Sequence, residues 1–314
     1  MSVVALHTTD TTTLESAVAR FLRRDAFEAT TRSAYGRTLD ALVAQVGADA
    51  LVASVTTEGV EDLMDQRWGH TAATTYNRHR AALLSFFAWA MDRGVCPVNP
   101  VRLVEPRKVR RTSEDAKRER PIPRAMLEQL WGIEAPLRDK LLWRMAYETW
   151  ARADELLRMD VPDLDLANRE GQVHGKGGDV ETVWWATGTA RLLPRVLEGR
   201  TSGPVFLASR KPTRAMPVAD LDPTTGRARL SYRQAERSFT EAGRRLDPAG
   251  PAWTMHRLRH SGIAHAVEDG WNLANVRAKS RHSSLRSLEV YANPSADSIA
   301  AMTAALDPEA RRKS

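Results

Sequence analysis

Four prolines between Asn99 and Arg124 limit most strongly how this 314-residue chain can fold. They are Pro100, Pro106, Pro121 and Pro123. Because proline has no N–H and its ring clashes with the preceding turn, no continuous helix can pass through this stretch. The chain is long enough for two domains with separate cores. We therefore predict a first domain over residues 1–98, a linker over 99–120 and a second domain over 121–314.

Apolar residues recur every three or four positions before the prolines, which is typical of amphipathic helices. Four helices are predicted in this part, one starting at Thr13 and the others over Glu28–Val46, Thr57–Trp68 and Thr71–Arg93. Helices of this number and length form a small bundle. The fourth carries Arg78, His79 and Arg80 on its early turns. Such a charge run is usually a solvated helix face, and contact with phosphates is the alternative.

The second part mixes helical and strand patterns. Helices are expected at Met126–Trp131, Leu137–Thr149, 187–197 and 231–246. Near the end of the chain, two short helices are expected at 272–278 and 284–291, and a last helix at 295–306. Three short strands are expected between them, at Val161–Leu166, Gly171–His174 and Glu181–Trp185. The predicted fold class is mainly α with a small antiparallel β-sheet, an N-terminal four-helix domain followed by an α+β domain.

A dense group of polar side chains lies between His256 and Tyr291. His256, Arg259 and His260 share one predicted helix capped by Thr254, and His282 precedes Tyr291 by nine residues. An arginine can bind two oxygens of one phosphate, and a histidine can exchange protons with it near neutral pH. A tyrosine beside them would have an electrophile to attack. The stretch therefore indicates covalent phosphoryl transfer.

Three further residues indicate a functional site only when they are combined with this stretch. Arg152 and Glu155 are three residues apart, which alone indicates a surface ion pair. Lys176 occupies a Gly-Lys-Gly-Gly hairpin turn, where an exposed lysine is common. This turn is no P-loop, because it lacks the required spacing and the following helix.

The charge balance makes a polyanionic partner plausible. Lys and Arg number 46 against 39 acids, which gives a net charge of +7 and a pI near 9.8. In residues 99–124 the basic side chains, Lys108, Arg110 and Arg111 among them, outnumber the acids nine to four. An extended basic segment can clamp a DNA duplex by releasing counterions, and a plain interdomain tether is the alternative.

Taken in order, these residues resemble the tyrosine recombinases of the phage integrase family. The similarity rests on Arg152 with Glu155, Lys176 on a hairpin, the pattern HxLRH with His256, Arg259 and His260, then His282, and Tyr291 nine residues later. It covers nearly the whole chain. Two departures are Arg281, where the family usually has glycine, and TWAR in place of TGLR around Arg152. No arm-binding domain is evident, which favours an Xer-like or transposon-integrase-like enzyme.

The resemblance implies a mechanism and partners. Arg152 and Arg259 would clamp the scissile phosphate, His256 and His282 would hydrogen-bond it, Lys176 would protonate the leaving oxygen, and Tyr291 would form a 3′-phosphotyrosine. Glu155 and His260 would support them, and Arg78, Arg80, Lys108, Arg110 and Arg111 would bind DNA. It implies no metal, no ATP and no other cofactor. It also implies strand exchange through a Holliday junction by a tetramer on two double-stranded DNA sites, with a free monomer compatible and residues 295–306 docking on a neighbour.

Other classes are less well supported by the residues. His256 and His260 have metal-ligand spacing, but no HExxH glutamate is present and the flanking arginines repel a cation. A type IB topoisomerase or an inactive DNA-binding member remain alternatives to the recombinase. One cysteine, Cys96, excludes an intrachain disulfide. The sequence shows no signal peptide or membrane span, so we expect a cytoplasmic protein with no membrane partner.

Overall fold

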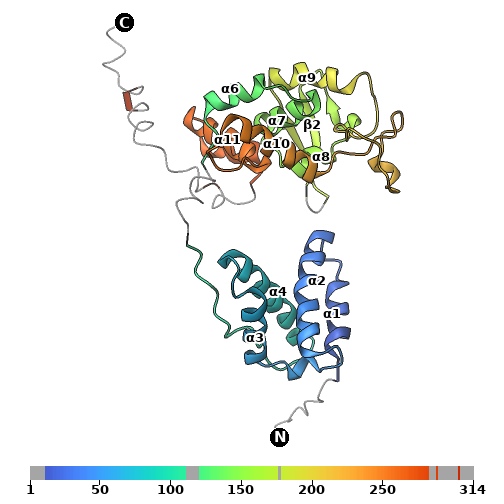
Figure 1. Cartoon of the computed structure of the whole chain (residues 1–314), viewed down its shortest axis with the longest axis vertical. Coiled ribbons are helices and arrows are strands. Elements are labelled where there is room, and N and C mark those ends of the chain that lie inside the picture. Colours follow the sequence, from blue (N-terminus) through green and yellow to red (C-terminus); the bar gives the residue numbers. More distant parts are fainter. Residues whose placement is uncertain (1–10, 111–119, 176–177, 283–287, 289–302, 305–314) are drawn as a thin grey trace. The chain divides into compact units, whose positions relative to one another are not determined.

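The computed structural model describes residues 11–110, 120–175, 178–282, 288 and 303–304. The chain divides into two compact units, Met1–Arg111 and Thr112–Ser314, each with its own hydrophobic core (Figure 1).

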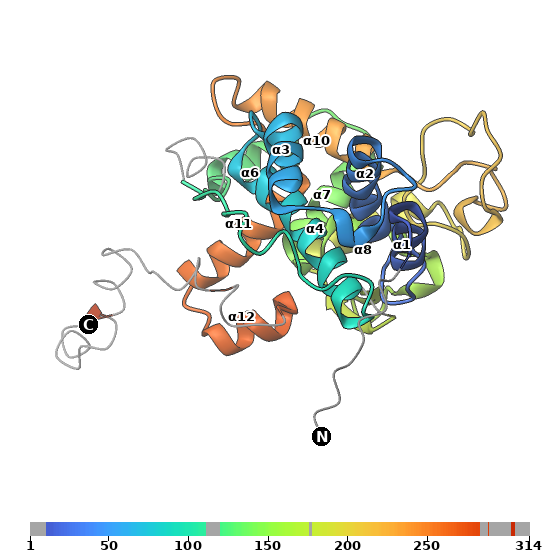
Figure 2. The ribbon, with the colours of Figure 1, turned by 90° about the horizontal axis from the view of Figure 1, so that it is seen from below.

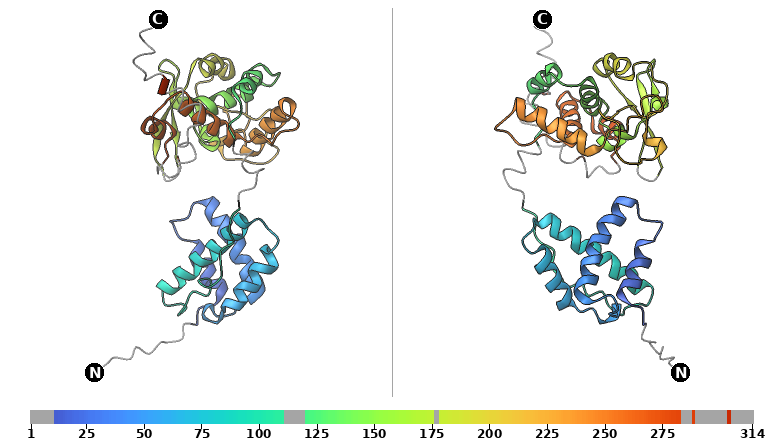
Figure 3. Two further views of the ribbon diagram at one scale, coloured as in Figure 1. Left: turned by 90° about the vertical axis from the view of Figure 1, so that its left-hand side faces the viewer. Right: turned by 45° about the vertical axis from the view of Figure 1, so that its right-hand side comes forward.

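The first unit is a four-helix bundle, as predicted (Figure 3). Its helices are α1 (Leu14–Leu22), α2 (Ala29–Val46), α3 (Thr57–Trp68) and α4 (Ala73–Asp92), with a 3-10 turn at Val52–Ser54. Helix α4 contacts each of the other three, and Phe86 and Phe87 on it are fully buried. Thr56 caps α3 by accepting the Gly59 N–H at 3.1 Å, so the cap precedes the expected Thr57 by one residue.

Residues 99–107, expected to begin the linker, are attached to this bundle. Val101 and Val104 are buried in its core. Asn77 on α4 exchanges two hydrogen bonds of 2.8 Å with the backbone of Arg107. Arg80 donates its Nε–H to the Val104 carbonyl. These contacts place the segment in the first unit, and the division between units falls after Arg111.

The second unit is built around α7. Its helices are α6 (Arg124–Gly132), α7 (Leu137–Thr149), α8 (Ala153–Arg158), α9 (Thr187–Leu197), α10 (Tyr232–Leu246), α11 (Met255–Glu268) and α12 (Leu273–Ser280). Helix α7 packs against α8, α9, α10 and α11. Helix α12 follows α11 at one side of the unit (Figure 2). Trp143 and Trp253, each 1% exposed, lie in its core.

A small antiparallel sheet completes this unit. Its strands β1 (Leu164–Asp165), β2 (Glu170–His174) and β3 (Val180–Trp184) lie in that order, with Gln172 opposite Thr182. The fold class predicted from the sequence is confirmed. The first strand is shorter than expected, because Pro162 cannot donate to a ladder and residues 161–163 form a 3-10 turn.

Candidate active site

Arg152 and Glu155 lie at the junction between α7 and α8. Trp150 leaves α7 in the left-handed region (φ 56°), and Arg152 is the residue directly before α8. Glu155, the third residue of α8, accepts the backbone N–H of Arg152 at 2.9 Å and its Nη1 at 2.6 Å. This is the reciprocal half of a capping box. The Glu155 side chain is buried, whereas that of Arg152 is 54% exposed, so the guanidinium is held in orientation but open to a ligand.

Glu155 is ionised despite its burial. Desolvation alone would raise its pKa, but the charge of Arg281 and the hydrogen bonds and charge of Arg152 outweigh it and lower the pKa. The carboxylate therefore stays charged at neutral pH and can hold Arg152 in place.

Helix α11 supplies His256 and Arg259 from one face. Thr254 caps the helix as predicted, accepting the Arg257 N–H at 3.3 Å. Arg259 is 3% exposed. Its Nη1 donates to the Trp150 carbonyl and its Nη2 to the Ser280 carbonyl at 2.6 Å. The guanidinium is thus fixed between the end of α7 and the end of α12.

A glycine lets α11 approach α7 closely enough for these bonds. A Cβ on Gly262 would lie 2.4 Å from the Tyr147 carbonyl oxygen and 2.6 Å from Trp150 Nε1. Both distances are shorter than any real contact, so the helix separation requires glycine. The packing of α7 and α11 therefore determines where Arg259 lies.

His282 follows α12 and faces Arg259. Its Nε2 lies 3.5 Å from Arg259 Nη2, and its Nδ1 lies 2.6 Å from the Ser280 hydroxyl. Burial, then the charges of Arg259, Arg152, His256 and Arg281, lower its pKa to about 4. Without a bound anion the ring is therefore neutral near pH 7.

His256 shows the same influence from the neighbouring arginines. The residue reaches the surface, yet enough of its ring is packed among protein atoms that desolvation, with the charges of Arg259 and Arg152, lowers its pKa. A neutral imidazole can accept a proton, which is the role that a general base needs. After burial, the charges of Arg259 and Arg152 are the main causes that lower the pKa of both histidines, so the four side chains lie near one another.

The turn before His282 keeps a glycine-like conformation without glycine. Arg281 ends α12 with φ 57° and ψ 38°, the left-handed region. Its side chain donates to Glu155 Oε2, and its Nε lies 2.9 Å from Glu181 Oε2 on β3. The departure from the family pattern at this position therefore leaves the turn intact.

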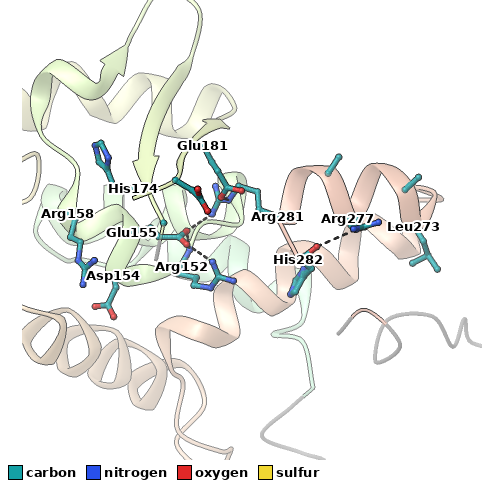
Figure 4. A pocket seen from close by; sticks show the side chains of 14 residues that line it. Arg152, Asp154, Glu155, Arg158, His174, Glu181, Leu273, Arg277, Arg281 and His282 are labelled. Atoms are coloured by element: carbon teal, nitrogen blue, oxygen red, sulfur yellow. Dashed lines mark hydrogen bonds and ion pairs between the residues drawn. The ribbon is translucent and has the colours of Figure 1, made fainter. Parts of the chain in front are cut away.

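A cavity of about 1210 Å³ opens beside these residues (Figure 4). Its lining residues are Arg152, Asp154, Glu155, Arg158, His174, Gly175, Asp179, Glu181, Leu273, Ala274, Arg277, Ala278, Arg281 and His282. Helix α8, helix α12 and both strands of the β2–β3 hairpin border it. An opening of this size with an exposed guanidinium at its wall can admit a phosphodiester group.

Three of the predicted site residues, Lys176, Tyr291 and Arg111, lie outside the described residues. Lys176 follows Gly175, which lines the cavity. His260 is half-buried on α11, beside Arg259 in sequence.

The predicted DNA-binding residues of the first unit differ in their surroundings. Arg78, Lys108 and Arg110 are exposed, whereas Arg80 is partly buried and bonded to Val104. His79 contacts Thr38 at 2.7 Å and stacks on Trp68, so it packs α4 against α2 and α3. In the basic run on α4, His79 and Arg80 therefore contribute to packing, whereas Arg78 is an exposed charge.

Sequence patterns did not single out three groups that build the site. The Trp150 and Ser280 carbonyls hold Arg259, and Glu181 pairs with Arg281. Backbone carbonyls leave no trace in residue types, so only the fold could identify the first two. Arg281 did stand out as a departure from the family pattern.

Within the described part of the chain, no group of three or more His, Cys, Asp or Glu side chains could hold a metal ion. None of the helices described is long and apolar enough to cross a membrane.

Family models match most of the chain. The description "Phage integrase family" matches residues 124–297, more than half of the chain, and "Phage integrase, N-terminal SAM-like domain" matches residues 20–94. The chain therefore belongs to the phage integrase family, the tyrosine recombinases.

Two similar proteins are described as the tyrosine recombinase XerC. Tyrosine recombinase XerC of Mycobacterium bovis (strain BCG / Pasteur 1173P2) is 32% identical over 225 residues, 70% of this chain and 72% of the relative. XerC of Mycobacterium sp. (strain KMS) is 32% identical over 226 residues with the same coverage.

Solved structures confirm the fold. The Tn1549 transposon integrase in complex with transposon right end DNA has a TM-score of 0.67 at 18% identity, covering 94% of this chain and 99% of that one. A lambda integrase (75–356) dimer bound to a COC′ core site has a TM-score of 0.68 at 17% identity, covering 90% and 96%. At these identities the likeness is one of fold.

Proposed function

We propose that this protein is a site-specific DNA recombinase that cleaves and rejoins strands through a 3′-phosphotyrosine at Tyr291. The observation that carries this proposal is the convergence of side chains from three separate elements. Arg152 and His282 line one cavity, Arg259 lies 3.5 Å from His282, and the charges of Arg152 and Arg259 reach both His256 and His282. In a phosphodiester exchange, negative charge grows on the nonbridging oxygens, and prearranged donors stabilise it.

The proposed cleavage step uses each residue once. The Tyr291 oxygen forms a bond to phosphorus while the bond to the 5′ oxygen breaks, and the phosphate stays attached to the 3′ side. His256 accepts the tyrosine proton, and Lys176 gives a proton to the departing 5′ oxygen. Arg152 and Arg259 bind the nonbridging oxygens, and His282 donates a hydrogen bond to one of them. A 5′ hydroxyl then reverses the step, so no net energy source is needed.

Three of the described tyrosines are unsuited to the role. Burial and nearby acids raise the pKa of Tyr76 and Tyr147, and burial with Glu236 and Asp154 raises the pKa of Tyr232 to about 12. A nucleophile needs the opposite shift, toward the ionised form.

We further propose that the first unit grips the duplex with Arg78, Lys108, Arg110 and Arg111, with Arg80 supporting the segment that carries them. The Tn1549 integrase is described with DNA and lambda integrase as a dimer on a core site, which supports double-stranded DNA sites and an oligomer here. We propose four copies on two sites, exchanging strands through a Holliday junction. The XerC relatives are bacterial, and bacterial DNA lies in the cytoplasm, so we propose that this protein acts there.

A suicide DNA substrate tests this function. A nick next to the cleavage position lets the short fragment that carries the released 5′ hydroxyl diffuse away, so the covalent adduct accumulates and shifts on a denaturing gel. We expect adduct in the presence of a chelator, and none from Tyr291→Phe, which loses only one oxygen and should still bind DNA. Tyr232→Phe is the matched control and should form adduct normally.

The same assay separates the competing classes. Residual adduct from Tyr291→Phe would identify another nucleophile. Cleavage that requires a divalent metal would contradict the mechanism, and relaxation of supercoiled DNA by a monomer would indicate a topoisomerase.

A further inference from the structure

An arginine occupies a backbone conformation that favours glycine. Arg281 has φ 57°, and its N–H still closes the end of α12 on the Arg277 carbonyl at 2.9 Å. Glycine adopts this region without a steric penalty, whereas a side chain with a Cβ does so at a cost. The backbone therefore gains nothing from arginine here, and its reason lies in the side chain.

That side chain joins three elements. It is 5% exposed and donates to Glu155 on α8, while its Nε lies 2.9 Å from Glu181 on β3 (Figure 4). The Glu155 side chain is 7% exposed, so this pair is shielded from solvent. A buried guanidinium with two carboxylates has little freedom to move, because displacing it would leave charges unpaired.

Glu155 connects Arg281 to Arg152, the arginine that faces the proposed phosphate site. One of its oxygens binds the Arg152 side chain at 2.6 Å. The other accepts the Arg152 backbone N–H at 2.9 Å and the Arg281 guanidinium. Arg281 thus removes the remaining rotation of the carboxylate that orients Arg152.

We propose that Arg281 is a positioning residue for strand cleavage, which fixes Glu155, and through it Arg152, by bridging α8 and β3 at the turn that presents His282. This inference rests on the proposed function, because it assigns a role in that reaction. In this proposal Arg281 is directed away from the DNA phosphate, because its guanidinium faces the carboxylates of Glu155 and Glu181, whereas the Arg152 side chain is 54% exposed.

Single-turnover adduct formation with excess suicide DNA tests the proposal. Arg281→Gly keeps the left-handed turn and removes only the bridge. We expect its adduct rate to fall by at least about tenfold, since small misplacement of a phosphate ligand is costly, while its DNA Kd changes by less than about threefold. Arg281→Lys, which keeps the charge but cannot bridge both carboxylates, should recover only part of the rate.

A double-variant cycle distinguishes positioning through Glu155 from other effects. We expect Arg281→Gly to cause no further loss in a Glu155→Gln background, because the two residues act as one unit. Arg169→Gly is the matched control: Arg169 also has a positive φ (56°) and lies outside the cavity lining, so its rate should be unchanged.

Several results would overturn the inference. A wild-type adduct rate for Arg281→Gly would show that the arginine side chain is not needed for cleavage. Additive losses with Glu155→Gln would show that Arg281 acts through its electrostatic field and not by positioning Glu155. Unfolding of Arg281→Gly, seen as loss of the thermal transition, together with full activity of Arg281→Lys, would indicate a merely structural role. No adduct from the wild type would contradict the proposed function itself, and this inference with it.

Discussion

Arg259 combines burial, charge and two carbonyl partners in a single side chain. It is 3% exposed, and the Trp150 and Ser280 carbonyls fix its guanidinium in the structure without DNA. Such prearrangement means that no reorganisation is needed when charge develops on the phosphate. The residue therefore serves the fold and the reaction at once.

Replacing Arg259 with alanine should remove one clamp of the phosphate. We expect the adduct rate to fall by about 10²–10³. Arg259→Lys should restore little, because one ammonium cannot satisfy both carbonyls and a phosphate oxygen. Single-turnover gels give the rate, and thermal unfolding checks the fold. Cleavage by Arg259→Ala near the wild-type rate would remove this residue from the site.

His282 makes stability depend on pH. Its pKa falls from an ordinary 6.5 to about 4 in the folded chain, so below pH 6.5 the unfolded chain binds a proton that the folded chain does not. The contribution of the neutral ring is complete above pH 6.5 and is lost as pH falls toward 4. We expect His282→Asn to lose less thermal stability between pH 7 and pH 5 than the wild type does, measured by Tm. Equal losses in both proteins would contradict the assignment.

At the scale of elements, the contact of α7 and α11 determines the geometry of the site. Gly262→Ala places a Cβ 2.4 Å from the Tyr147 carbonyl oxygen, so the helices must separate. We expect about 1–3 kcal/mol of lost stability, typical of overpacking, and slower adduct formation because Arg259 moves from Trp150. Gly132→Ala at the end of α6 is the control, since its Cβ would meet nothing within 4 Å. Similar denaturation midpoints for the two variants would argue against this account.

At the scale of the whole molecule, net charge governs the grip on DNA. The chain carries +7, and Arg78 is exposed on α4. If Arg78 contacts a phosphate, Arg78→Ala should weaken binding equally on all sequences and make the slope of log K against log salt shallower by about 1. Arg195→Ala removes the same charge from α9 and should leave the slope unchanged. Fluorescence anisotropy over a salt series gives both slopes, and equal slopes for Arg78→Ala and wild type would exclude this contact.

Local features of the sequence predicted most of the elements. Helical periodicity, the Thr254 cap and Gly47 after α2 act over a few residues, so they can be read without the fold. Two details differ from these patterns. Pro162 shortened the expected first strand, and residues 99–107 pack on the first unit through Val101 and Val104, a long-range contact that no local pattern reveals.

The order and types of the site residues were determined by the sequence, because side-chain chemistry is fixed by residue type. Their convergence was decided by tertiary structure. Arg152, Arg259 and His282 are far apart along the chain, and they meet because the packing of α7, α11 and α12 brings carbonyls and guanidiniums together. Burial, and then the charges of Arg259 and Arg152, lower the pKa of His256 and His282 once the fold has formed. The pairing of Arg281 with two carboxylates arises in the same way. Charges act through space, so their effect could not be known before the fold placed them.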